Sequence, residues 1–183
     1  MTITEILIDE HKDIIELLNI MSKIARNIKS NNVFYTSDVE DIIDFLKFFI
    51  DKNHHGKEEI LFPAIISPEI KEENKSLNEI LYEHTVARNY LKDIYSCVEN
   101  CKIGNAFSGE LLADSLNNYV LLIKEHIQKE EETIFPMAEV VLSAEKKDEI
   151  YDLFERLESK LLTKDFRGHY HKLLENLQAK YPG

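Results

Sequence analysis

A short motif occurs twice in this chain of 183 residues, first as HHGKEEILFP at residues 54–63 and again as HIQKEEETIFP at residues 126–136. A Glu-His pair precedes each copy, at residues 10–11 and 83–84. The offset between the two halves is 73 residues from His11 to His84, 72 from His54 to His126 and 73 from Pro63 to Pro136. Two ordered copies at a nearly constant offset predict that the second half of the chain repeats the first around a pseudo-twofold axis.

Apolar residues recur at helical spacing along most of the chain, which contains only 5 Gly and 4 Pro. This combination argues against a sheet with many turns and favours long helices. The expected helices cover residues 4–28, 37–63, 75–101, 109–136, 143–157 and 168–181. The predicted fold class is all-α: an up-down four-helix bundle over about residues 1–142, with two additional C-terminal helices over about residues 143–183, in a single domain.

Particular residues mark the expected helix ends. Ser37 and Ser143 are predicted N-caps, and Gly104 is predicted to stop the third helix. The second helix is expected to end near Pro63, with Pro63 and Pro68 forcing a corner, and Pro136 is expected to interrupt the fourth helix. The segment between the motif's first glutamate and its proline is one residue shorter in the first copy. This difference is expected to shift the corner and to leave the histidine and glutamate positions before it in place.

The apolar stripe of each of the four long helices contains one histidine. Leu7, His11 and Ile14 are spaced along one face of the first helix, and the other three long helices repeat this pattern. In the second and fourth helices a glutamate follows one turn after the histidine on the same face. The predicted core positions are His11, His54, Glu58, His84, His126 and Glu130.

This set of polar residues predicts a metal site. A single core histidine is usually a hydrogen-bonded packing residue, but an ionised carboxylate in an apolar core costs on the order of several kcal/mol unless it is paired or bound to a cation. A metal would neutralise the carboxylates and hold the imidazoles, whereas a metal-free structural bundle would leave these charges in the core. The pseudo-twofold axis would bring the two half-sites together, with Glu58 and Glu130 bridging two metal ions.

The donor types indicate which metal is preferred. The set contains no thiolate, which excludes a closed zinc site of the cysteine type. Imidazoles with bridging carboxylates suit iron best, with manganese and zinc less favoured. Ferritin-like di-iron bundles use Glu-x-x-His and more carboxylates, so the His-x-x-x-Glu spacing here predicts a different, histidine-rich site.

Together with DEHK at 9–12 and YEHT at 82–85, the two motifs resemble the hemerythrin-like (HHE cation-binding) family. The likeness covers about residues 1–140, and the remainder resembles the tail of longer bacterial members. The resemblance implies a non-haem di-iron site with an oxo or hydroxo bridge inside a four-helix bundle. It places His11 and His54 on one iron and His84 and His126 on the other, with Glu58 and Glu130 as bridges.

The resemblance also indicates the subtype. Oxygen-carrying hemerythrins have a fifth histidine one turn from the position that matches His84. Here Ile80 and Arg88 occupy the positions one turn to either side. The chain therefore resembles the four-histidine type, which weakens the interpretation as a simple oxygen carrier.

Three functions remain open at this point. The preferred one is a di-iron protein that binds O2 or NO for storage, sensing or protection against oxidative and nitrosative stress. The second is a di-iron enzyme that removes peroxide, as a catalase or peroxidase does. The third is an iron donor that repairs damaged iron-sulfur proteins.

Charge and terminal sequence restrict the other partners. A formal net charge of −12 and a pI near 5.0 disfavour nucleic acid, because a basic face is needed to neutralise phosphates. The start MTITEILIDEHK has no basic region and no cleavage site, and no apolar run approaches the ~20 residues that span a bilayer. We expect a cytoplasmic protein without a membrane partner.

Several further residues are weaker candidates. His55 and Glu59 each follow a predicted ligand by one position, about 100° around the helix, so a solvated face is expected, with a hydrogen bond to a ligand or a water as the alternative. Glu131 competes with Glu130 as the bridge, and the alignment of the two copies favours Glu130. The remaining candidates are expected to be ordinary thiols, Cys97 and Cys101, and surface histidines, His169 and His171.

Overall fold

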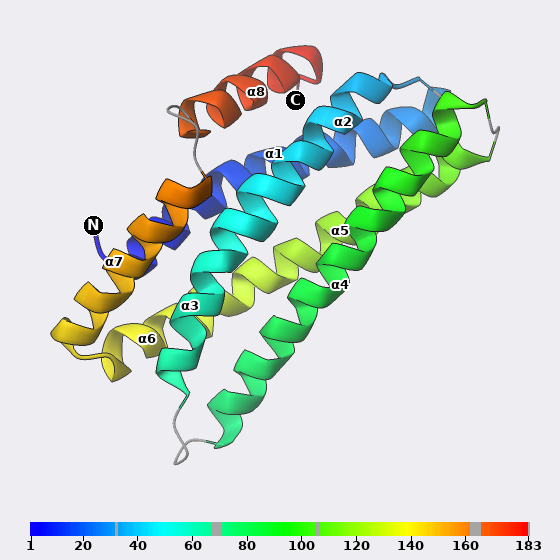
Figure 1. The fold of residues 1–183 in the computed structure, drawn as a ribbon. Coiled ribbons are helices and arrows are strands. Elements are labelled where there is room, and N and C mark those ends of the chain that lie inside the picture. The colour runs from blue at the N-terminus through cyan, green and yellow to red at the C-terminus, as the bar shows by residue number, and fades with distance from the viewer. Residues whose placement is uncertain (32, 67–70, 105–106, 162–165, 183) are drawn as a thin grey trace.

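The computed structural model describes residues 1–31, 33–66, 71–104, 107–161 and 166–182, and the side chains of residues 71–74 lie outside this description. All regular structure in these ranges is helical, and four long segments run alternately up and down (Figure 1). These segments are α1 (Ile3–Asn31), α2–η1–α3 (Thr36–Asp44, Phe45–His54 and His55–Ile65), α4 (Lys71–Lys102) and α5–η2–α6 (Ser108–Lys129, Glu130–Ile134 and Phe135–Val141). With α7 (Ala144–Leu161) and α8 (Phe166–Lys180), they confirm the predicted all-α fold with additional C-terminal helices.

Two of the predicted helix ends are confirmed. The Ser143 hydroxyl accepts a hydrogen bond from the Lys146 backbone N–H at 3.2 Å, which caps the start of α7. Gly104 has a φ of 81° just after the end of α4, in the left-handed region where an L side chain would be strained. The left-handed glycine thus marks where the chain leaves α4.

Of the other predicted ends, the Ser37 cap and the interruption at Pro136 are wrong. Tyr35, with extended backbone, is the N-cap of α2, so Ser37 lies inside the first turn. α3 includes Pro63 and ends at Ile65, so the second helix does end near Pro63, and Pro68 lies outside the described residues. Pro136 lies in α6 directly after η2, and the helical path continues past it to Val141 without interruption.

The buried residues of the π-helical segment η1 recur at an unusual spacing. Its buried residues come in adjacent pairs that recur every four positions, Phe45–Leu46, Phe49–Ile50 and Asn53–His54. This four-residue period is longer than the 3.6-residue repeat of an α-helix, and the segment has wider turns than an α-helix. His54 therefore ends the segment on the same buried face as the phenylalanines.

The second π segment, η2, accommodates the extra residue of the second motif. It begins at Glu130 and ends at Ile134. Ile134 and Phe135 are 1% and 2% exposed, as deeply buried as Leu61 and Phe62 of the first motif. Because a π turn holds one more residue than an α turn, Ile134 and Phe135 keep the buried positions of Leu61 and Phe62.

A polar layer divides the interior into two apolar clusters. One cluster contains the upper parts of α1, α2–η1, α4 and α5, and the other joins Ile3, Leu7, Leu61 and Phe62 to the lower part of the bundle and to α7. Between them lie buried ionisable side chains from all four segments. The buried ionisable side chains of the four segments therefore lie together in a single layer of the bundle.

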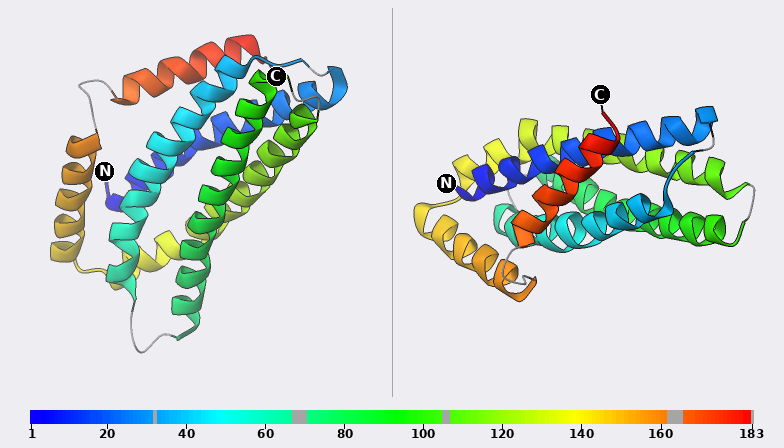
Figure 2. Two further views of the ribbon diagram at one scale, coloured as in Figure 1. Left: turned by 45° about the vertical axis from the view of Figure 1, so that its right-hand side comes forward. Right: turned by 90° about the horizontal axis from the view of Figure 1, so that it is seen from above.

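The last two helices pack on the outside of the bundle, as the views in Figure 2 show. α7 contacts α3, η1 and α1, and α8 contacts α1. Phe166 and Tyr170 of α8 also meet the rings of Phe45 and Phe49 on η1, at centroid distances of 4.8 to 6.0 Å within this aromatic group. Among the helices in the described ranges, none is both long enough and apolar enough to cross a bilayer.

Candidate metal centre

The structure brings the six predicted residues together in the polar layer. α1, η1, α4 and α5 each supply one histidine, α3 supplies one glutamate, and the first residue of η2 supplies the other. All six side chains are at most 1% exposed: His11, His54, Glu58, His84, His126 and Glu130. Six ionisable groups in one dry layer must pair with each other or bind a cation.

Each glutamate faces one histidine of each predicted pair. Glu58 lies 3.1 Å from His54 Nε2 and 3.3 Å from His84 Nε2. Glu130 lies 3.0 Å from His126 Nε2 and 3.4 Å from His11 Nε2. Two carboxylates that each span two imidazoles have the placement expected of bridging ligands.

The facing atoms are not satisfied by hydrogen bonds. In the part of the chain that the structure describes, neither oxygen of Glu58 or Glu130 has a hydrogen-bond partner, and the same is true of Nε2 of His84 and His126. Buried polar atoms are normally paired. Nitrogen and oxygen atoms that converge within the layer without hydrogen bonds fit a bound cation.

The outer nitrogen of each of these four histidines faces a carboxylate. His54 Nδ1 lies 3.0 Å from Glu10, and His126 Nδ1 lies 3.0 Å from Glu83. His11 Nδ1 lies 2.7 Å from Glu131 of the second repeat, and His84 Nδ1 lies 3.2 Å from Glu59 of the first. Since a carboxylate only accepts, each Nδ1 donates and Nε2 is left to point inward. Such pairs orient metal-binding histidines.

Glu59 and Glu131 lie at the edge of the cluster. Both carboxylates are about two-fifths exposed, at 41% and 40%, yet each contacts a core histidine, so a purely solvated face is wrong for Glu59. Glu130 is the buried member of the Glu130–Glu131 pair, and Glu131 lies outside the cluster against His11. The sequence analysis also missed the contacts of Glu10 and Glu83, although the repeated Glu-His pairs were a visible signal for them.

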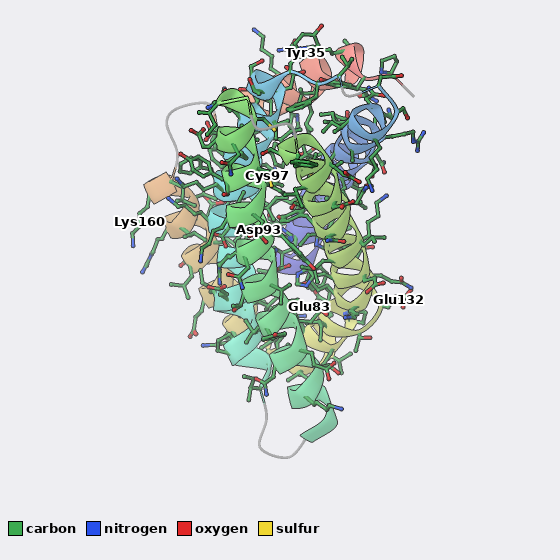
Figure 3. All side chains as sticks on the ribbon, turned by 90° about the vertical axis from the view of Figure 1, so that its right-hand side faces the viewer. Tyr35, Glu83, Asp93, Cys97, Glu132 and Lys160 are labelled. Carbon is green, nitrogen blue, oxygen red and sulfur yellow. The ribbon has the colours of Figure 1, made fainter. Side chains whose placement is uncertain are left out.

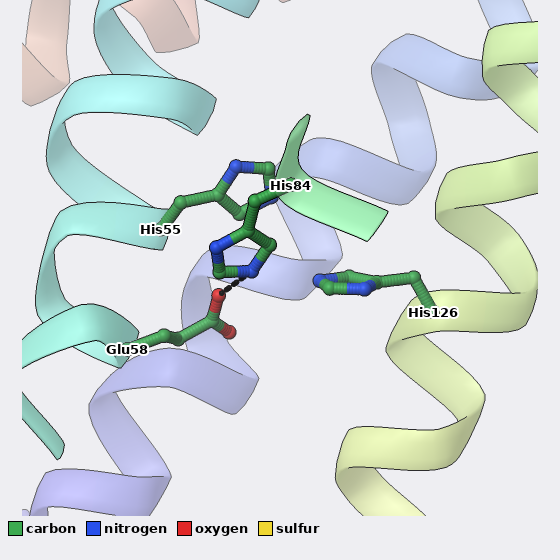
Figure 4. A group of neighbouring side chains, drawn as sticks. All are labelled: His55, Glu58, His84 and His126. Carbon is green, nitrogen blue, oxygen red and sulfur yellow. Dashed lines mark ion pairs between the residues drawn. The ribbon is translucent and has the colours of Figure 1, made fainter. Parts of the chain in front are cut away.

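His55 is the largest departure from the sequence analysis. It is 2% exposed, so the predicted solvated face is wrong, and its ring stacks on His84 with centroids 4.0 Å apart and planes at 9°. Neither ring nitrogen has a hydrogen-bond partner among the described residues. Figure 4 shows His55 converging with Glu58, His84 and His126 from three different helices. A fifth core histidine is therefore present, supplied by α3.

Two overlapping groups of donor atoms result. In each group the ligand atoms lie within 4.8 Å of one another, and Glu58 belongs to both. The first group is His11, His54, Glu58 and Glu130, and the second is His55, Glu58, His84 and His126. Imidazole nitrogens with carboxylate oxygens form a donor set suited to iron, zinc or manganese.

The surroundings shift the pKa values of the metal-free site. Burial would lower the pKa of His54, but the charge of Glu58 and the hydrogen bond to Glu10 outweigh it and raise the pKa to about 10. Burial is likewise outweighed at His126, where Glu130 and Glu83 raise the pKa to about 10. At His55, burial and the nearby histidine charges lower the pKa well below its usual value. The metal-free layer therefore holds two imidazolium groups beside a neutral His55.

Other candidate residues lie away from this layer. Cys97 and Cys101 are free thiols whose pKa values are raised by burial, and Figure 3 shows Cys97 well separated from Glu83 along α4. His169 and His171 are exposed, as expected.

The comparison with known families agrees with this geometry. The family model described as the hemerythrin HHE cation binding domain matches residues 2–138, and it matches residues 75–177 a second time. The first match covers the four long segments, and the second begins near the start of α4, where the second repeat begins. No curated protein and no solved structure matches the chain significantly.

Proposed function

Because the chain belongs to the hemerythrin HHE cation-binding family, we propose that it is a non-haem di-iron protein that binds O2 or NO at the buried histidine and glutamate cluster. We assign one iron to His11 and His54 and the other to His84 and His126, with His55 as an additional donor to the second. Glu58 and Glu130 serve as the bridges between the two ions.

One observation carries the proposal: each glutamate faces one histidine of each pair at 3.0 to 3.4 Å, with its oxygens unpaired among the described residues. A single ion would need only one of the two donor groups. Two groups that share Glu58 fit two ions held side by side. Two cations would offset the charges of both glutamates and occupy the unpaired nitrogen atoms.

Iron bound here would supply a redox-active centre with coordination positions that the protein leaves open. The residues of this chain do the positioning. The carboxylates of Glu10 and Glu83 accept the Nδ1 protons of His54 and His126, which keeps their Nε2 atoms directed inward. The two apolar clusters above and below the layer exclude bulk water from it.

Burial favours small ligands over large ones. The cluster residues are at most 2% exposed, so an organic substrate would have to displace packed side chains to reach them. A diatomic molecule needs the least displacement, which supports O2 or NO as the ligand. We further propose that the protein acts in the cytoplasm as a sensor or in protection against oxidative or nitrosative stress.

The first test is iron content with the visible absorption spectrum of protein purified under iron-replete conditions. We expect two irons per chain and an oxo-bridged di-ferric band. His54→Ala and Glu130→Ala should lose half or more of the iron, whereas His171→Ala, at an exposed position that contacts Asp13, should keep it. Equal iron content in all three variants would refute the ligand assignment.

A second test separates binding from the two alternatives. The reduced protein should change its spectrum with O2 or NO at a fixed ratio per di-iron unit, without turnover. Steady disproportionation of peroxide would instead support an enzyme. Reactivation of a damaged iron-sulfur protein, with loss of iron from this chain, would support iron donation.

A further inference from the structure

A buried lysine connects the metal site to the C-terminal helices. The side chain of Lys57 on α3 is 0% exposed, and its Nζ forms ion pairs with Glu10 of α1 and Glu158 of α7. Glu10 is itself buried and accepts a hydrogen bond from His54 Nδ1 at 3.0 Å. A continuous chain of contacts therefore runs from α7 to a proposed iron ligand.

α8 joins the same network. Arg167 places a guanidinium nitrogen 3.3 Å from Glu10 Oε1 and 3.8 Å from the carboxylate of Glu158. Asn53 donates a third contact to Glu10 Oε1 at 2.9 Å. The position of the Glu10 carboxylate thus depends on α7 and α8 as well as on the bundle.

The second repeat offers an internal comparison without this cover. There His126 Nδ1 lies 3.0 Å from Glu83, which pairs with Lys129. Lys129 and Glu83 are 47% and 14% exposed, whereas Lys57 and Glu10 are 0% and 1% exposed at the side chain. The same histidine–glutamate–lysine arrangement is therefore solvated in one repeat and enclosed in the other.

A glycine on α3, Gly56, allows α7 to pack close to the first motif. A Cβ atom added at Gly56 would lie 3.0 Å from Leu157 Cδ2 of α7, which is tighter than ordinary packing. The corresponding residue of the second repeat is Gln128, whose side chain would fill this space. The first motif is thus adapted to receive a helix on the face that the second motif leaves open.

Packing alone does not explain a lysine at this position. Burying an ammonium group is costly, and an apolar side chain of similar volume often serves stability equally well. The ammonium group of Lys57 pairs with Glu10, and this ion pair holds the Glu10 carboxylate where it accepts the hydrogen bond from His54 Nδ1.

We propose that Lys57 is a positioning residue that acts through Glu10 on His54, so that docking of α7 and α8 controls how firmly the ion on the His11–His54 side is held. The inference rests on the proposed di-iron function. It assigns the C-terminal helices a role in retaining one of the two ions, and leaves the ion on the His84–His126 side independent of them.

The test compares Lys57→Met with the matched variant Lys129→Met. Both proteins are loaded anaerobically with two Fe²⁺ per chain and mixed with excess ferrozine, whose coloured ferrous complex reports iron release. Lys57→Met should release one of its two irons about tenfold faster than the unmodified protein, as expected when an outer partner of a ligand is lost. Lys129→Met should release both at the unmodified rates, because water already solvates its pair.

A second variant at a less buried position keeps the test valid if Lys57→Met does not fold. Glu158→Gln removes one end of the network at a carboxylate that is 22% exposed, and it should accelerate release of the same single iron. Circular dichroism confirms that each variant is folded before loading. A merely structural role would lower the unfolding temperature without selecting one ion.

The outcomes are distinguishable. Unchanged release from both Lys57→Met and Glu158→Gln, equal acceleration of both irons, or an equal effect of Lys129→Met would overturn this inference and leave the di-iron function intact. An unmodified protein that takes up no iron would overturn the proposed function and this inference with it.

Discussion

At the scale of single residues, the two repeats differ most at the position after the motif's leading histidine. The first repeat has His55 and the second has Ile127, and both are buried, at 2% and 5% exposed. Neighbouring positions on a helix diverge by about 100°, so a helix in a four-helix bundle can direct two successive side chains towards two different neighbours. His54 faces His11 of α1, and His55 stacks on His84 of α4.

The variant His55→Ile tests whether this residue is a ligand. It gives the first repeat the residue that the second repeat already packs at the matching position. We expect affinity for the second iron to fall on the order of tenfold or more, because one nitrogen donor is removed. The metal-free protein should be at least as stable as the unmodified one, since a buried imidazole without hydrogen-bond partners is replaced by an apolar side chain.

Iron titration followed by mass spectrometry of the native protein checks the first effect, and thermal unfolding of the metal-free form checks the second. If the variant takes up both irons with unchanged affinity, His55 is a packing residue.

At the scale of helices, the π segment η2 allows two repeats of unequal length to occupy equivalent positions. The extra residue lies between Glu130 and Ile134, so the ligand before it and the core residues after it keep their places. Without a π turn, one inserted residue would rotate everything after it by about 100°.

Deleting Glu132 tests this account. Glu132 is exposed, and its deletion restores the spacing of the first motif, so the segment can close into an α-helix with Ile134 and Phe135 still inward. We expect a folded protein that retains two irons and loses at most about 2 kcal/mol of stability, because the helix after the deletion stays in register.

Deletion of Lys124 is the matched control, since this residue is also exposed but lies in the regular part of α5. That deletion should rotate the segments on either side out of register and prevent iron uptake. Equal damage from both deletions, measured by circular dichroism and iron content, would contradict the role given to η2.

The helices were largely predictable, and the π segments explain part of what was not. Apolar periodicity located all six helical segments, and the repeat brought the six predicted site residues into one layer. The prediction failed where only one of two successive residues of the first motif was assigned to the core. His55 reaches the core because two neighbouring helices receive the successive side chains of the motif, a tertiary arrangement that spacing alone does not contain. Glu59 contacts His84 for the same reason.

At the scale of the whole molecule, the charged layer makes the stability of the metal-free form and the affinity for metal depend on pH in opposite directions. In the metal-free protein, the raised pKa values of His54 and His126 mean that these imidazolium groups pair with the nearby carboxylates. A group whose pKa is raised on folding contributes stability that is full below its unfolded pKa, near 6.5, and is lost as pH rises towards about 10. Metal binding has the opposite dependence, because the histidines must release these protons.

The gap in unfolding temperature between the two forms should therefore widen as pH rises. We expect the metal-free protein to lose stability between about pH 6.5 and pH 8.5, because the unfolded chain releases protons that His54 and His126 keep in the folded protein. Over the same range the affinity for iron should increase, because metal binding has to release these protons. At a free ion concentration 100-fold above Kd, each bound ion adds about 2.7 kcal/mol, equivalent to about 5 to 10 °C for a chain of this size. Anaerobic thermal unfolding with and without Fe²⁺ across this pH range measures the gap.

The double variant Glu58→Gln/Glu130→Gln provides the control. It removes both proposed bridges and the charges that raise the pKa values of His54 and His126, while the side chains keep their size. Its unfolding temperature should not respond to Fe²⁺, and its metal-free stability should vary less with pH than that of the unmodified protein. A gap that stays constant with pH in the unmodified protein would mean that the two histidines are already neutral before metal binds, and that the carboxylates alone provide the electrostatic attraction for the ions.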